Sequence, residues 1–117
     1  MDYRVQRVIS LMEDSLGLQW SVADLAKAVN LSPWRLCHIF KTETTVGLVR
    51  YLRTLRMEQA RRLLETTFLS VKEITNKVGA RDESHFLRDF KATYGLSPAK
   101  YRSKFLRIRS TKELRKH

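Results

Sequence analysis

The sequence predicts an all-α protein in which two helix-turn-helix subdomains are joined by a long linker helix, with about seven helices altogether. One observation is a single amphipathic run over residues 46–66. Another is that the same short pattern of caps and apolar residues occurs on both sides of that run. The third is a formal net charge of +11, from 23 Lys and Arg against 12 Asp and Glu. So strong a positive charge favours a polyanionic partner, although a basic composition also occurs in small proteins that bind no anion, so the distribution of the charge has to decide.

Residues 46–66 form the longest helical pattern in the chain. Apolar residues recur three to four positions apart along it, and no proline interrupts it. The apolar positions are Leu48, Leu52, Leu55, Ala60, Leu63 and Leu64. A helix of about 20 residues is about 30 Å long, close to the ~34 Å between successive major grooves on one side of B-DNA. This coincidence gives the hypothesis that the segment is a spacer between two DNA-reading motifs, which the flanking sequence has to test.

The first motif consists of two short helices joined by a tight turn. Ser21 and Asp24 have the spacing of a capping box, which begins a helix of about nine residues. Asn30 follows that helix and is one of the few non-glycine residues that tolerate a left-handed turn. Ser32 and Pro33 then indicate a cap followed by proline at the first helical position. The second helix is the first candidate recognition helix, at about residues 33–43.

The second motif repeats these features after the spacer. Ser70 and Glu73 form another capping box, 49 positions after Ser21 and Asp24, and Gly79 falls where Asn30 stood. Asp82 caps the second candidate recognition helix, at about residues 82–93. In this helix Phe90 lies 50 positions after Phe40. An internal repeat of this quality indicates two copies of one structural unit.

The two ends of the chain carry weaker signals. Residues 3–15 are predicted to form an amphipathic scaffold helix that ends with Gly17 near its C-terminal cap. Residues 103–117 form a basic tail, whose apolar residues, among them Phe105, are compatible either with an extension of the last helix or with a solvated segment. If the tail reaches DNA, it adds salt-dependent affinity without sequence information.

Several functional classes are excluded by what the sequence lacks. Cys37 is the sole cysteine, so an internal disulfide is impossible, and no histidine or cysteine spacing suggests a metal site. No paired carboxylates, activated nucleophile or glycine-rich phosphate loop suggests an enzyme or a bound cofactor. Without a signal-like segment or a long apolar run, we expect a cytoplasmic, nucleoid-associated protein.

The two motifs and the spacer between them resemble a known protein family. Residues 20–102 are similar to the DNA-binding domain of the AraC/XylS family of bacterial transcription regulators. The second motif carries the closest resemblance, at Gly79, Asp82, Ser84, His85, Phe86, Arg88, Phe90, Lys91, Gly95, Ser97, Pro98 and Tyr101. The chain departs from the family pattern at Ala80, where a large apolar residue is usual, and at Thr45 and Gly47-Leu48. A different packing at the second turn and a less sharply capped spacer helix are expected there.

The resemblance implies a sequence-specific regulator that inserts both recognition helices into adjacent major grooves of promoter DNA. The short chain corresponds to a free-standing member of the family or to an excised DNA-binding domain. Two recognition helices in one chain remove the need for a dimer, so a monomer on double-stranded DNA is expected, with RNA polymerase as a second candidate partner. The alternative function is that of a non-specific or architectural nucleic-acid-binding protein.

The domain boundaries follow from the repeat. They are an N-terminal helix-turn-helix subdomain at 1–45, a linker helix at 46–66, a C-terminal helix-turn-helix subdomain at 67–102 and a basic tail at 103–117.

The resemblance implies that seven side chains on the outer faces of the two recognition helices approach DNA bases. They are Trp34, Cys37, His38, Glu83, Ser84, Leu87 and Arg88. Arg88 is favoured for specificity, because a guanidinium can pair with both O6 and N7 of guanine. It could instead bind a phosphate or form a salt bridge with Asp89 or Glu83. Trp34 could instead pack against the first helix, and His38 could simply face solvent.

Six further residues are candidates for phosphate contacts. Ser21 and Ser70 mark helix starts whose backbone amides can bind an anion, and the other four supply positive charge. Those four are Arg35, Lys41, Arg81 and Lys91. His85 is expected to be structural, at the boundary of the core.

Overall fold

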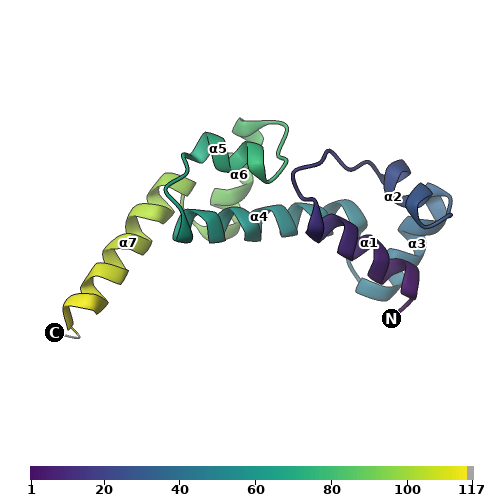
Figure 1. The fold of residues 1–117 in the computed structure, drawn as a ribbon, viewed down its shortest axis with the longest axis horizontal. Coiled ribbons are helices and arrows are strands. Elements are labelled where there is room, and N and C mark those ends of the chain that lie inside the picture. Colours follow the sequence, from purple (N-terminus) through teal and green to yellow (C-terminus); the bar gives the residue numbers. More distant parts are fainter. Residues whose placement is uncertain (116–117) are drawn as a thin grey trace. The chain divides into compact units, whose positions relative to one another are not determined.

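The computed structural model describes residues 1–115, and side chains as far as residue 109. All regular structure in the described residues is helical, which confirms the predicted fold class. The helices, shown in Figure 1, are α1 (Tyr3–Asp14), α2 (Val22–Ala28), α3 (Pro33–Thr44), α4 (Leu48–Thr66), α5 (Val71–Lys77), α6 (Glu83–Tyr94) and α7 (Pro98–Arg115). None of the described helices is both long and apolar enough to cross a membrane.

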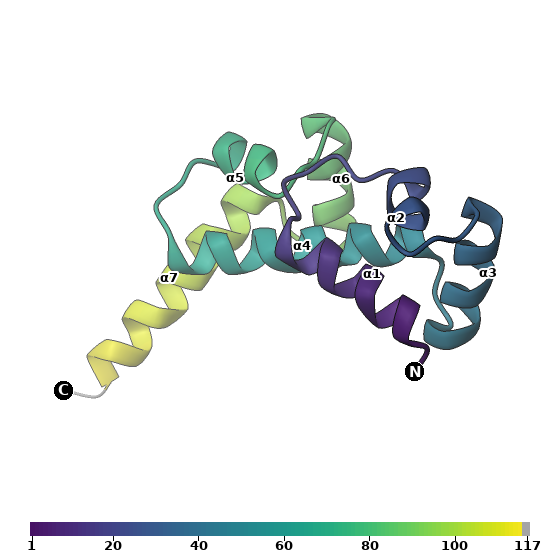
Figure 2. The ribbon, with the colours of Figure 1, turned by 45° about the vertical axis from the view of Figure 1, so that its right-hand side comes forward.

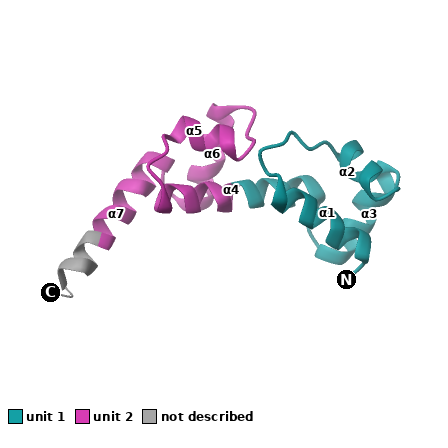
Figure 3. Ribbon diagram, in the orientation of Figure 1, with its two compact units in different colours: residues 1–56 teal, residues 57–117 magenta. Residues whose placement is uncertain are grey.

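The chain forms two compact units, residues 1–56 and residues 57–117, as coloured in Figure 3. The division falls within α4. Each unit therefore contains one helix-turn-helix motif and its own hydrophobic core, and each is described by itself below.

Unit 1 is built from α1, α2, α3 and the first half of α4 around one core. The buried residues of this core are Val5, Val8, Met12, Leu25, Ala26, Leu36, Phe40, Leu48 and Leu52. The capping box predicted for α2 is present, with Ser21 Oγ accepting a hydrogen bond from the Asp24 amide at 3.0 Å. Asn30 has a φ of 57°, which confirms the predicted left-handed turn between α2 and α3.

The end of α1 lies within one residue of the predicted bound, but it does not use a left-handed glycine. The helix ends at Asp14, and its C-terminal cap is Ser15 with a φ of −141°, so Gly17 is not the cap. The physical reason is that the Ser15 carbonyl oxygen already accepts hydrogen bonds from two other groups. The indole Nε1 of Trp20 donates to it at 3.0 Å and the Leu18 amide at 3.1 Å. A left-handed glycine is not needed once the chain reversal satisfies this carbonyl.

Unit 2 repeats the arrangement with the second half of α4 and with α5, α6 and α7. Its buried core consists of Met57, Ala60, Leu63, Leu64, Ile74, Val78, Phe86 and Phe90. Ser70 Oγ accepts from the Glu73 amide at 3.1 Å, as the predicted capping box requires. Gly79 has a φ of 83° at the turn, the role that Asn30 has in unit 1. Asp82 caps α6 through the His85 amide at 3.0 Å.

The repeat extends to the aromatic contacts of the two cores. In unit 1 the rings of Phe40 and Tyr51 meet edge to face, with centroids 5.3 Å apart. In unit 2 Phe90 and Tyr101, each 50 positions later, meet in the same way at 5.7 Å. These pairs fix the second helix of each motif against the long helix that follows it.

The two copies differ at the connection into the long helix that follows each motif. Thr45 caps α3 with a φ of 64°, whereas Gly95 occupies the equivalent position after α6 with a φ of 81°. The helix α4 begins at Leu48 rather than at residue 46, and the Gly47 carbonyl accepts the first hydrogen bond, from the Tyr51 amide at 2.9 Å. The expected weaker cap is therefore real, because Gly47 has no side chain with which to cap the helix.

The last helix, α7, is longer than its role in the motif requires. It runs to Arg115, so the segment after residue 102 takes the helical alternative as far as the structure describes it (Figures 1 and 2). Arg102 ties its first part to α4, donating to the carbonyls of Leu64 at 3.1 Å and Thr67 at 3.3 Å. These contacts satisfy carbonyls at and just beyond the C-terminal end of α4.

Candidate nucleic-acid interface

The outer face of α3 is formed by the residues that sequence reasoning selected for it. Leu36 and Phe40 are fully buried, which directs the opposite side of the helix outward. Trp34 is 72% exposed, so it does not pack against α1, the alternative that the sequence left open. Cys37 and His38 are also exposed. The three candidate base readers of unit 1 therefore share one solvent-facing surface.

Trp34 and His38 form a defined structure on that surface. Their rings are stacked, with centroids 5.3 Å apart and planes only 9° from parallel. They line, together with Cys37, Lys41 and Thr42, a shallow hollow of about 390 Å³. The two stacked rings form one flat aromatic surface about one helical turn long. Because the stack already restricts both side chains, they lose less conformational entropy when a ligand binds than two freely rotating side chains would.

The outer face of α6 has a more polar composition. Glu83, Ser84, Arg88 and Lys91 are all exposed, while Phe86 on the opposite side is buried. The face therefore offers a guanidinium, a carboxylate, a hydroxyl and an ammonium group along a single helix. These groups suit hydrogen bonding to base edges and attraction to phosphates.

Two residues of α6 are placed differently from the sequence-based expectation. Leu87, a candidate base reader, is partly buried and packs against the core of unit 2, unlike Cys37, its exposed counterpart 50 positions earlier. His85 was expected at the boundary of the core, but its side chain is 57% exposed and its Nε2 lies 3.6 Å from Asp89 Oδ2. The prediction for His85 was wrong because Phe86 and Phe90 fill the core without it.

The candidate phosphate contacts are all at the surface. Arg35, Lys41, Arg81 and Lys91 are exposed. The hydroxyl oxygens of Ser21 and Ser70 are already used as caps within α2 and α5, so an anion at these positions would meet backbone amides of the first turn.

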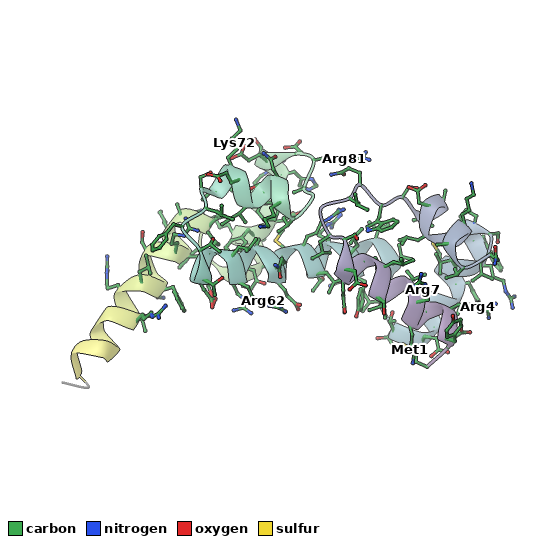
Figure 4. The ribbon with its side chains drawn as sticks, in the orientation of Figure 1. Met1, Arg4, Arg7, Arg62, Lys72 and Arg81 are labelled. Carbon is green, nitrogen blue, oxygen red and sulfur yellow. The ribbon has the colours of Figure 1, made fainter. Side chains whose placement is uncertain are left out.

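Sequence reasoning missed one further cation in unit 2. Lys72, in the first turn of α5, points outward on the same side of unit 2 as Arg81, whereas Arg62 points away on the opposite side (Figure 4). Its position two residues after the Ser70 cap was the available signal, because a side chain there lies beside the free amides of the helix start. The described residues contain no group of three or more side chains arranged to hold a metal ion.

Comparisons with known proteins show which family the chain resembles. A family model described as "Helix-turn-helix domain" matches residues 25–104, which include both motifs and α4. The structure is similar to that of the DNA-binding domain of AdpA, a global transcriptional factor, solved in complex with a target DNA, with a TM-score of 0.88 and 29% identity over 93% of this chain and 98% of that one.

The chain belongs to the AraC family of helix-turn-helix DNA-binding domains. It is 33% identical over 104 residues to the arabinose operon regulatory protein of Escherichia coli and 37% identical over 98 residues to the Msm operon regulatory protein of Streptococcus mutans. These matches cover 88% and 84% of the chain, but only 36% and 35% of the two relatives. Domains of this family are sequence-specific DNA-binding parts of transcriptional regulators and are not enzymes.

Proposed function

We propose that this AraC-family domain regulates transcription by placing α3 and α6 in successive major grooves of promoter DNA. The observation that carries the proposal is that both units present a capped helix of 12 residues whose inner face is buried and whose outer face is exposed. A helix of this length with one free face fits the major groove of B-DNA. The similarity to a domain solved with its target DNA supports the same role for this chain.

The two helices would read DNA with different chemistry. On α6, Arg88 would pair with O6 and N7 of guanine and Glu83 would accept from N4 of cytosine, with Ser84 as a smaller donor or acceptor. On α3, the exposed Trp34 and Cys37 favour apolar contact with thymine methyl groups, and His38 can donate or accept at a purine edge. Leu87 would contribute at most an apolar contact from its exposed half.

Phosphate contacts would fix the position of the domain on DNA. Arg35, Lys41, Arg81 and Lys91 would bind backbone phosphates, and the helix starts at Ser21 and Ser70 would donate from backbone amides. Such contacts release condensed counterions and so make affinity fall steeply with salt, without distinguishing base pairs.

The linker helix α4 would set the distance between the two recognition helices, α3 and α6. Its 19 residues correspond to about 28 Å at 1.5 Å per residue, somewhat less than the ~34 Å groove repeat. Bending of the DNA toward the protein would close this difference. With both reading helices in one chain, a single domain would suffice on DNA, and RNA polymerase would contact a face away from the DNA.

Selection of binding sites from random duplexes tests this proposal. We expect enrichment of an asymmetric motif in two parts whose centres are about ten base pairs apart, one helical turn. Hydroxyl-radical footprinting on the selected site should show protection on one side of the duplex only. Failure to enrich any two-part motif would instead support non-specific, architectural binding.

A further inference from the structure

Unit 2 contains a second surface, which includes none of the α6 residues discussed above. The end of α4, the loop after it and α7 enclose a hollow of about 260 Å³, which we call the α7 hollow. Its defining residues are Leu64, Thr67, Phe68, Arg102, Leu106 and Arg109. Phe68 is fully exposed, and Leu106 is 44% exposed. Two large apolar side chains thus face water at the rim of one concavity, an arrangement that marks an interaction site.

The internal repeat provides a reference for what this position needs structurally. Phe68 corresponds to Gln19 at an offset of 49, and Leu106 corresponds to Arg56 at an offset of 50. In unit 1 Arg56 reaches across and donates to the Leu18 carbonyl at 3.1 Å. The fold is therefore compatible with polar residues at both positions. The apolar pair in unit 2 is not required by the fold, and exposing it to water is unfavourable unless a partner covers it.

The shape of the hollow is fixed by strong local contacts. Arg102 donates to the Leu64 and Thr67 carbonyls, which holds α7 against the end of α4. Tyr101 on the neighbouring stripe of α7 donates to Glu65 at 2.6 Å. The surface is thus preformed, and a partner would lose little free energy in ordering it.

The charge of the surface indicates the chemistry of the partner. Arg102 and Arg109 line the hollow, whereas Lys100, Lys104 and Arg107 of the same helix line a different hollow. The carboxylate of the lining residue Glu65 is engaged by Arg61 at 2.8 Å and by Tyr101. An incoming segment therefore meets an apolar centre bordered by the two guanidinium groups of Arg102 and Arg109.

We propose that the α7 hollow docks an acidic amphipathic helix of another protein. Its apolar stripe would cover Phe68 and Leu106, and its carboxylates would lie beside the positive charges of Arg102 and Arg109. DNA fits this surface less well, because a phosphate backbone cannot bury the exposed phenylalanine and leucine. The inference is independent of how α3 and α6 read bases.

The test uses the full chain and a fluorescein-labelled synthetic helix of about 16 residues, with Leu and Phe at three-to-four spacing and Glu elsewhere. We expect saturable binding by fluorescence anisotropy. Phe68→Gln and Leu106→Arg, which install the residues of the first copy, should each weaken it at least about five-fold, because each removes a large buried apolar contact. Val49→Gln, at another exposed apolar residue, is the matched control and should change nothing.

The variants separate apolar docking from simple charge attraction. Leu106→Arg adds a positive charge, so a purely electrostatic complex would bind the acidic helix more tightly, and that result would overturn the proposal. Equal binding of a peptide with Lys in place of Glu would overturn it as well. Thermal unfolding of each variant verifies that it is folded.

A parallel titration with the selected DNA duplex shows whether this surface binds the acidic peptide or DNA. Phe68→Gln and Leu106→Arg should leave DNA affinity unchanged within about two-fold, as expected for surface changes outside the DNA interface. Arg109→Glu should weaken the peptide and spare the DNA. An equal loss of both would mean that this face of α7 binds phosphates, and the protein-docking proposal would be wrong.

Discussion

The hydroxyl of Tyr101 donates a hydrogen bond of 2.6 Å to Glu65 Oε2, joining α7 to α4 across 36 positions of sequence. Arg61 binds the same carboxylate oxygen at 2.8 Å. Burial raises the pKa of the Tyr101 phenol, and the hydrogen bond to Glu65 raises it further, whereas Arg61 opposes both effects. The pKa of Arg61 is also raised, first through Tyr101 and then through Glu65. These three residues form one cooperative connection within unit 2.

Loss of this connection should destabilise the protein measurably. Tyr101→Phe keeps the edge-to-face contact with Phe90 but removes the donor to Glu65. We expect the free energy of unfolding to fall by about 1.5 kcal/mol, typical for a partly buried hydrogen bond to a charged acceptor. Tyr3→Phe, at a residue that is 77% exposed, is the control and should change it by less than about 0.5 kcal/mol. Urea unfolding followed by circular dichroism measures both; equal values would contradict the structural role.

Tyr101 should also make the stability of the folded protein fall at alkaline pH. Since the pKa of Tyr101 is raised in the folded state, its contribution to stability is complete below the ordinary tyrosine pKa of about 10 and is lost as pH rises above that value. The unfolded chain then releases a proton that the folded chain retains. Tyr101→Phe should therefore show a shallower loss of stability above about pH 10 than the parent, whereas Tyr3→Phe should follow the parent.

A substitution in the connection between α3 and α4 is predicted to raise the stability of the protein. Thr45 is a β-branched residue held at a φ of 64°, where its counterpart in the second copy is Gly95. Thr45→Gly should raise the free energy of unfolding by about 1 kcal/mol by removing this strain. Gly95→Ala should lower it by a similar amount, although a Cβ there would meet no atom within 4 Å. A decrease for Thr45→Gly would show that unfolded-state entropy outweighs the strain.

A second change tests the weak N-terminal cap of α4. The equivalent of Gly47 is Ser97, whose Oγ accepts from the Lys100 amide at 3.3 Å. Gly47→Ser should supply the same cap and stabilise the protein by a few tenths of a kcal/mol. Gly47→Ala, which adds a Cβ into open space but no acceptor, is the control, and the difference between the two measures the cap alone.

The two roles assigned on α6 should separate in binding experiments. Arg88→Ala should cost about 1 to 3 kcal/mol on the preferred site and relax preference at one base pair. Lys91→Ala should weaken all sequences alike and reduce the salt dependence of binding by about one counterion. Competition assays with single-base variants of the selected site measure both. Identical profiles for the two variants would show that the roles are assigned wrongly.

The two tryptophans of unit 1 are predicted to behave oppositely. Trp34 is 72% exposed, so Trp34→Ala should leave the melting temperature nearly unchanged but weaken DNA binding, with the loss confined to one half of the site. Trp20→Phe removes the indole donor to Ser15 and should destabilise the fold by about 1 kcal/mol without changing base preference. A loss of stability in Trp34→Ala would indicate a packing role instead.

Much of the fold followed from local chemistry that can be read from the sequence. Ser21, Ser70 and Asp82 cap the helices expected of them, and Asn30 and Gly79 have the expected positive φ, because these features depend on a few neighbouring residues. The exposed face of α3 likewise followed from the 3.6-residue period once Leu36 and Phe40 were assigned to the core. The predicted bounds of α1, α3, α4 and α6 were correct to within two residues for the same reason, whereas the length of α7 had been left open.

Features that depend on distant residues were decided only in the tertiary structure. The cap of α1 at Ser15 rests on Trp20, the exposure of His85 on how Phe86 and Phe90 fill the core, and the half-burial of Leu87 on the rest of unit 2. The stack of Trp34 on His38 and the α7 hollow are also three-dimensional relationships. The sequence by itself determined the helices, the repeat and the family, because caps and apolar periodicity act locally. Only packing decided which polar and aromatic side chains remain available to a partner, because burial depends on every element that surrounds a residue.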